Sequence, residues 1–243
     1  MASYLTLVKL MEQKGIVCLH SHYHEIILND KMLQSTYFAT SSVPIPDTYQ
    51  VYGVPSAKDL AYSKLAGPTI VKHLNDYGGD SVFKVEDKWN VVNAVAKNLW
   101  KGEHVILQKM VVDSIGQSIR VLCIEGTAFA MMTYEDESGD FRSNVSMGQN
   151  FKCTNLMDHP KFKTYKEIAE KAISSIGDVL IGGVDILDSK SEGVVVLEIN
   201  SFPDVYDIWY HTKMCTFKRL AEAFMNKIKK RLDKENVEIV YLE

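Results

Sequence analysis

Three oxygen-bearing side chains, Asp185, Glu198 and Asn200, belong to one segment with the pattern of a β-hairpin. Apolar, β-branched residues form both arms of this segment, and turn-forming residues separate the arms. If residues 190–193 form the loop, Asp185 faces Glu198 across the two strands. Because side chains alternate along a strand, Asn200 then projects from the same face as Glu198.

The same register pairs Ser189 with Val194 and Leu187 with Val196. It also brings two carboxylates together, with β-carbons about 5 Å apart. Like charges at this distance would destabilise the sheet, and apolar neighbours would strengthen the repulsion by lowering the local dielectric. A divalent cation would remove the conflict, and three oxygen ligands without His or Cys suit Mg²⁺. Taken alone, the pattern fits equally well a carboxylate facing solvent at a sheet edge, or a different register.

Two further segments carry donors that suit phosphate oxygens. Arg142, Ser143 and Asn144 place a guanidinium, a hydroxyl and an amide in consecutive positions. Arg120 stands near the start of an apolar, strand-like stretch. By itself the first group is more simply interpreted as a surface turn with a solvated arginine.

A lysine and a pair of glycines form a third candidate. Lys72 ends an apolar strand-like run, and Gly78 and Gly79 follow in a turn. A lysine in this position can reach a phosphate that the backbone N–H groups of the turn surround. Two adjacent glycines in a turn are nevertheless a weak signal.

The elements that must position these residues are helices and strands in mixed order, which indicates an α+β or α/β protein. The periodicity of apolar residues predicts them along the whole chain. Expected helices cover 4–14, the segment after Asn29-Asp30-Lys31, 88–100, 162–176 and 213–234, and expected strands cover 16–19, 69–72, 82–85, 104–109, 119–134 in two parts, and 181–200 as the hairpin.

Together these segments resemble the ATP-grasp superfamily, and specifically its RimK-like branch of glutamate and amino-acid ligases. The resemblance runs from about residue 5 to 225, and the last three motifs are the specific ones. In order, the motifs are Asn29-Asp30-Lys31, Ile70-Val71-Lys72, Leu107-Gln108, Ile119-Arg120-Val121-Leu122, Gly139-Asp140-Phe141-Arg142-Ser143-Asn144, Gly183-Val184-Asp185-Ile186-Leu187 and Leu197-Glu198-Ile199-Asn200-Ser201-Phe202-Pro203.

The resemblance implies an α+β fold, the ATP-grasp fold, in which two lobes clasp ATP. It implies a remnant of a preceding domain at 1–28, a small lobe at 29–110, and a large lobe with the metal site and a basic C-terminal helix at 111–243. The family's preceding domain recognises substrate. Its role would be lost, taken over by a partner, or supplied in a homodimer.

The resemblance also implies roles for single residues. Phosphates of ATP would be held by Lys31, Lys72, Arg142, Ser143 and Asn144, with Gly78 and Gly79 in the mobile lid loop, and the backbone of 107–111, which contains Gln108, Lys109 and Met110, would bind adenine. Arg142 and Arg120 would serve the reaction centre. Asp185, Glu198 and Asn200 would hold Mg²⁺, or Mn²⁺ in its place, with Glu198 bridging two ions.

Four positions depart from the family pattern. Lys109 and Met110 stand where a glutamate and an aromatic residue are usual, and Ser118 replaces an aspartate that touches the nucleotide. Ser118 can still donate a hydrogen bond but brings no charge. Asp204 replaces a glycine in a loop near the acceptor site.

The implied reaction is carboxylate–amine ligation with ATP. A carboxylate attacks the γ-phosphate to give an acyl phosphate and ADP, and an amine of an amino acid, a peptide or a protein tail then forms the amide. Two alternatives remain open. One is an ATP-grasp kinase of a small hydroxylated substrate, and the other is a non-catalytic ATP-binding protein.

Composition limits which partners and which cellular compartment are expected. The net charge of −4 argues against broad nucleic-acid binding, and the apolar runs are too short to span a bilayer. Four scattered cysteines and the absence of a signal-peptide pattern favour a reduced, cytoplasmic protein. One cluster, Cys18, His20, His22 and His24, would share one face of an extended segment with metal-ligand spacing, although a polar loop is the simpler interpretation.

Overall fold

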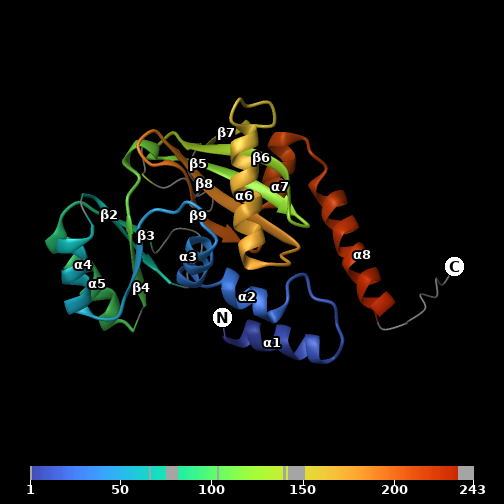
Figure 1. Ribbon diagram of the computed structural model, residues 1–243, viewed down its shortest axis with the longest axis horizontal. Coiled ribbons are helices and arrows are strands. Elements are labelled where there is room, and N and C mark those ends of the chain that lie inside the picture. Colours follow the sequence, from blue (N-terminus) through green and yellow to red (C-terminus); the bar gives the residue numbers. More distant parts are fainter. Residues whose placement is uncertain are drawn as a thin grey trace.

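A computed structural model of the chain contains two antiparallel sheets with helices around them (Figure 1). The structure describes residues 2–65, 67–74, 82–102, 104–138, 141 and 151–234. The four-stranded sheet has the order β1-β4-β2-β3, and the five-stranded sheet has the order β7-β6-β5-β8-β9. The predicted α+β class is therefore confirmed.

The four-stranded sheet and two helices form one apolar core. Val71 and Leu107 of the sheet pack there against Val91 and Val95, which lie on a helix. Side chains alternate along a strand, so Lys72 lies on the opposite face from Val71. The elements are β1 (Thr48–Val51), α4 (Val54–Ser63), β2 (Thr69–His73), β3 (Val82–Val85), α5 (Lys88–Trp100) and β4 (Val105–Lys109).

The five-stranded sheet is built from two hairpins and an edge strand. Glu125 (φ 51°) and Gly126 (φ 78°) make the tight turn of the first hairpin, and they divide the stretch 119–134 into the two strands that were predicted. The strands are β5 (Gln117–Ile124), β6 (Thr127–Asp136), β7 (Phe151–Asn155), β8 (Ile181–Ser189) and β9 (Gly193–Asn200), and a 3₁₀ turn, η1 (Val112–Ser114), precedes them.

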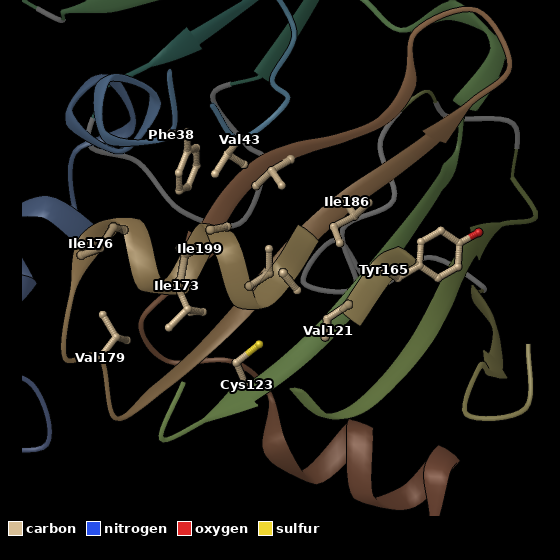
Figure 2. Close-up of a cluster of buried hydrophobic side chains, with 14 of the residues drawn as sticks. Phe38, Val43, Val121, Cys123, Tyr165, Ile173, Ile176, Val179, Ile186 and Ile199 are labelled. Carbon is tan, nitrogen blue, oxygen red and sulfur yellow. The ribbon is translucent and has the colours of Figure 1, made fainter. Parts of the chain in front are cut away.

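Helices cover both faces of this larger sheet. On one face, α6 (Phe162–Ile176) and α3 (Lys31–Thr40) enclose the cluster of Figure 2, in which Ile173 and Phe38 pack with Ile186 and Ile199 of the sheet. On the other face lie α7 (Val205–Thr212) and α8 (Thr216–Lys234), with Ile208 and Ala223 in the contact. Arg120 and Asp185 also lie on this second face, and Asp185 is buried there.

The N-terminal segment forms α1 (Ala2–Gln13) and α2 (His22–Leu28). The predicted helix 4–14 is confirmed, and Gly15 (φ 76°) follows its end. The predicted strand 16–19 is wrong: this apolar run only connects the two helices, and Ile16 is exposed. An apolar run of four residues cannot by itself distinguish a strand from a connection that packs at a few points.

A β-bulge in the second hairpin changes the predicted register. Near the turn, Ser189 pairs with Gly193 and Leu187 pairs with Val195, so the predicted pairings of Ser189 with Val194 and Leu187 with Val196 are wrong. The loop is one residue shorter than expected, and Gly193 (φ 76°) closes it. The register then shifts by one at Leu197.

The bulge restores the pairing that matters for the site. Asp185 lies opposite Glu198, as predicted, while Val196 turns into the core. In a strand without a bulge, Val196 and Glu198 would be two positions apart and would project from the same face. Among the described helices, none is long and apolar enough to cross a bilayer.

Candidate active site

Three charged residues form a row across neighbouring strands of the larger sheet. Arg120 on β5 pairs in register with Asp185 on β8, and Asp185 pairs with Glu198 on β9. Residues directly opposite in antiparallel strands share a face, so the three side chains project together. They lie on the face away from α6.

Arg120 holds Asp185 through a two-point contact. Its Nε donates to Oδ1 at 2.6 Å, and its second guanidinium nitrogen donates to Oδ2 at 2.7 Å. Burial by itself would lower the pKa of Arg120, but the Asp185 carboxylate more than offsets this and raises it. Burial raises the pKa of Asp185, and the guanidinium limits that rise. The planar fork therefore fixes the orientation of the carboxylate.

Gly183 leaves the space that this contact needs. A Cβ at this position would lie 3.0 Å from Cδ of Arg120 and 2.7 Å from Cβ of Pro203. Its neighbour Gly182 is crowded on the opposite face, where a Cβ would lie 2.7 Å from Cδ1 of Ile173. The two glycines thus let the Arg120 side chain pack closely against one face of β8 and helix α6 pack closely against the other.

Glu198 and Asn200 carry side-chain oxygen atoms that accept no hydrogen bond from any described residue. The amide nitrogen of Asn200 donates to Oδ2 of Asp185 at 2.9 Å, so its carbonyl oxygen points elsewhere. Neither that oxygen nor the half-buried Glu198 carboxylate has a hydrogen bond or an ion pair to any residue that the structure describes. Two adjacent side chains can therefore each offer oxygen ligands.

Lys72 approaches the same charges from the smaller sheet. It is only 8% exposed, and burial lowers the pKa of its ammonium group. Glu198 and Asp185 oppose that shift, and the positive charge of Lys31 adds to it. Since such interactions weaken with distance, Lys72, Lys31 and the carboxylates share one site. Within the described ranges, the ammonium group has no hydrogen-bond partner.

The predicted Asn-Asp-Lys segment positions Lys31. Asp30 caps α3 by accepting hydrogen bonds from the N–H groups of Met32 and Leu33, each at 2.9 Å. Lys31 is the first residue of the helix, and its backbone N–H donates to the carbonyl of Leu74 at 3.3 Å. The end of β2 and the start of α3 are thereby joined, which brings Lys31 and Lys72 together.

The stretch 107–111, which is predicted to bind adenine, lies at the end of β4. Several of its hydrogen-bonding groups already have partners within the protein. The Gln108 side chain donates to Oγ1 of Thr48 at 2.8 Å. The N–H groups of Lys109 and Met110 donate to the carbonyls of Asp47 and Pro68. The Lys109 side chain forms an ion pair with Glu192 in the β8–β9 turn, which links the two sheets.

The remaining predicted residues divide into two groups. Ser118 lies two residues before Arg120 on β5, so it shares the face of the charged row. Gly78, Gly79, Arg142, Ser143 and Asn144 lie outside the described residues. The structure therefore unites Lys31, Lys72, Arg120, Asp185, Glu198 and Asn200 at one place, with Ser118 on the same face.

The donor chemistry fits a hard divalent cation, for a different reason from the one expected. Repulsion between Asp185 and Glu198 does not require a metal, because Arg120 already neutralises Asp185. The fit rests instead on the open oxygens of Glu198 and Asn200 beside Asp185, all of which suit Mg²⁺. The sequence missed this Arg120–Asp185 pairing, which depends on the order of strands β5 and β8.

The histidine cluster does not have the predicted geometry. His22 and His24 lie in α2, so the four side chains do not share the face of an extended segment. His20 is buried and bonds to Glu25 and to the carbonyl of Ile181. Among the described residues, the group with metal-ligand spacing of this type is a different one, Cys153, Asp207 and His211.

The sequence matches the RimK-like ATP-grasp domain over residues 28–224, most of the chain. The chain belongs to this family. The predicted family resemblance is therefore confirmed, and the architecture of the two sheets agrees with it.

Relatives of this RimK-like chain include ligases. A probable alpha-L-glutamate ligase of Coxiella burnetii is 28% identical over 206 residues, which cover 85% of the chain and 66% of the relative. One of Maridesulfovibrio salexigens is 25% identical, with 83% and 64% covered. The chain thus spans just under two thirds of the length of these relatives.

Solved structures share the RimK-like fold at lower identity. The D-cycloserine synthetase DcsG superposes with a TM-score of 0.73 at 17% identity, covering 93% of the chain and 79% of that protein. The ATP-grasp ligase PsnB, in complex with a phosphomimetic variant of its minimal precursor, Mg and ADP, gives 0.68 at 16% identity, with 93% and 66% covered. The predicted ATP-grasp fold is confirmed.

Proposed function

We propose that the chain is an ATP-dependent carboxylate–amine ligase that forms an amide through an acyl phosphate and releases ADP and phosphate. One observation carries the proposal. The buried ammonium group of Lys72, without a protein partner in the described part of the chain, interacts electrostatically with the unpaired Glu198 carboxylate, and Asn200 on the same strand has an open amide oxygen. A buried cation opposite unpaired oxygen ligands suits a substrate that brings both negative charge and a metal, as ATP does.

In this proposal the side chains act by charge and position. Lys72 and Lys31 bind phosphate oxygens and stabilise negative charge as the carboxylate attacks. Glu198, Asn200 and Asp185 would hold Mg²⁺, or Mn²⁺ in its place. The metal supplies Lewis-acid stabilisation of phosphate charge. Arg120 acts on the reaction centre by fixing Asp185.

The proposal extends to residues outside the described ranges. Arg142, Ser143 and Asn144 would contact the phosphates, with Arg142 at the reaction centre, and Gly78 and Gly79 would form the lid loop. Adenine would bind along 107–111, with Ser118 nearby. The domain boundaries after residues 28 and 110 remain part of the proposal. So does a homodimer or a partner that completes substrate recognition.

The substrates are proposed only by class. A relative named as a probable alpha-L-glutamate ligase supports an amino acid as one component. The complex of PsnB with a precursor supports a peptide as another possibility for the acceptor class. The acid and the amine are therefore to be sought among amino acids, acidic peptides and protein tails.

The metal role is tested with Glu198→Gln, which keeps the shape of the side chain and removes its charge. Magnesium-dependent ADP release should fall by at least about 100-fold, the effect typical of lost electrostatic stabilisation, while the circular dichroism spectrum stays unchanged. The matched control is Glu222→Gln on the exposed face of α8. Turnover of Glu198→Gln equal to that of the control would refute the assignment.

The reaction class is tested with the wild-type chain. ADP release is screened against amino acids and acidic peptides, and the products are analysed by mass spectrometry. Mass gain that corresponds to an amide supports ligation. A phosphorylated hydroxyl without an amide would instead identify a kinase, and ATP binding without turnover across the screen would identify a non-catalytic protein.

A further inference from the structure

A second cluster of ligand-type side chains lies on the same face of the larger sheet as the candidate active site, on α7 and the edge strand β7. It consists of Cys153, Asp207 and His211, whose candidate ligand atoms all lie within 4.8 Å of one another. All three residues are partly buried. Asp207 and His211 are one helical turn apart, so they share a face of α7, and Nε2 of His211 lies 3.4 Å from Oδ1 of Asp207.

We propose that Cys153, Asp207 and His211 bind a zinc ion, which ties helix α7 to strand β7. A thiolate, an imidazole and a carboxylate are the side chains that coordinate zinc, and three protein ligands leave a fourth position for water. Zinc–ligand bonds of about 2.0–2.3 Å place neighbouring ligand atoms roughly 3.3–3.6 Å apart in a tetrahedron. The Asp207–His211 separation already has this value, and the sulfur of Cys153 lies within 4.8 Å of the other two ligand atoms.

The surroundings of Asp207 support this site. The hydroxyl of Tyr134 donates to Oδ2 of Asp207 at 2.8 Å, while Oδ1 faces His211. A bond of this kind orients a ligating carboxylate from outside the coordination sphere. Tyr134 is 2% exposed and lies directly opposite Cys153 in the ladder of β6 and β7, so the sheet itself fixes the relative positions of the cysteine and the carboxylate.

The two metal sites would select different ions. Asp185, Glu198 and Asn200 offer oxygen alone, which suits Mg²⁺, whereas a thiolate and an imidazole prefer a softer ion such as Zn²⁺.

The test measures zinc binding by the full chain, without ATP, in competition with a chromogenic chelator. Wild type should bind one zinc ion that Cys153→Ser and His211→Ala each bind at least about tenfold more weakly. The matched controls, Cys215→Ser and His104→Ala, remove an exposed cysteine and an exposed histidine and should leave zinc binding unchanged. Equal loss in a control, or no tight zinc in wild type, overturns the proposal.

Two further measurements separate coordination from a structural role of the cluster. Cobalt in place of zinc should give a thiolate-to-metal charge-transfer band that Cys153→Ser lacks and Cys215→Ser keeps. Tyr134→Phe should weaken zinc binding about 10- to 100-fold by releasing Asp207. A cobalt spectrum without the thiolate band in wild type, with circular dichroism unchanged, would overturn the participation of Cys153.

Discussion

Two buried polar clusters of this protein differ in how completely they are bonded. In the first, His20 and Glu25 are each 1% exposed, and Nδ1 of His20 lies 3.0 Å from Oε1 of Glu25. Nε2 of His20 lies 2.8 Å from the carbonyl of Ile181, and the other Glu25 oxygen accepts from Asn29 at 3.0 Å. Every ring nitrogen and carboxylate oxygen of this cluster has a protein partner.

The second cluster, at the candidate active site, is only partly bonded. Arg120 and Asp185 satisfy one another, but Lys72, Glu198 and the amide oxygen of Asn200 have no hydrogen-bond partner among the residues described. Buried polar groups are normally hydrogen-bonded, because an unpaired one costs free energy. Closed bonding therefore favours a structural role for the His20 cluster, whereas open bonding supports the proposed ligand site.

The largest stability effect is expected in the closed cluster. Glu25→Ala leaves His20 and Asn29 without their buried acceptor, and breaking a buried pair in this way costs about 3–5 kcal/mol. Urea denaturation should show this loss in the free energy of unfolding. Glu222→Ala, at an exposed helical position, should stay within about 0.5 kcal/mol of wild type. If Glu25→Ala lowered the free energy of unfolding by less than about 1 kcal/mol, the structural role of the cluster would be contradicted.

The next prediction compares the two faces of strand β8. Gly182→Ala and Gly183→Ala should each lower the free energy of unfolding by about 1–3 kcal/mol, because both added methyl groups meet side chains at 2.7 Å. Only Gly183→Ala should also lower ATP-dependent turnover, since it displaces Arg120 on the site face. Denaturation and ADP release, measured on both variants, make the comparison. Equal loss of turnover in the two would contradict it.

A smaller effect on stability is expected from Lys72→Met. The variant removes a buried charge without a described partner, so the free energy of unfolding should stay the same or rise by about 1 kcal/mol. The affinity for magnesium-ATP, measured by calorimetry, should fall at least tenfold, or about 1.4 kcal/mol. If Lys72→Met instead destabilised the protein as strongly as Glu25→Ala, the open cluster would also be structural.

The smallest expected effect is a change of the free energy of unfolding with pH that is caused by Lys72. Burial lowers the pKa of this lysine in the folded protein below its ordinary value of 10.5, so the unfolded state binds more protons between these two values. Stability then rises with pH through that interval, as linkage requires. Wild type should therefore gain stability relative to Lys72→Met as the pH increases from neutral towards 10.5. A constant difference between the two across this range would contradict the burial of a charged lysine.

Much of this arrangement could be predicted from the sequence, because local patterns determine it. The hairpin around Glu125 and Gly126, helix α6 and the cap at Asp30 follow from turn chemistry, periodicity and capping. The pairing of Asp185 with Glu198 was also correct. The roles of the predicted site residues remain predictions, as do the domain boundaries.

The rest depends on contacts between segments far apart in the chain. That β5 lies beside β8, and so pairs Arg120 with Asp185, is a property of sheet order that no local pattern encodes. The edge strands β1 and β7 and the short helices α2, α4 and α7 were missed for a related reason. Short elements are stabilised mainly by packing on others, so their own sequences carry weak signals.

The bulge at Leu197 changes the phase of β9 between its two ends. Val196 faces the α6 core and Glu198 faces the site, although residues two positions apart in a regular strand share a face. Deleting Leu197 would make Glu198 the direct neighbour of Val196, so regular alternation would keep both side chains on their present faces. Keeping Leu197 in a strand without a bulge would instead turn Glu198 toward α6 and Ile199 toward the site. The strand can therefore lose this residue without losing the site, whereas the irregular backbone is required as long as the residue is present.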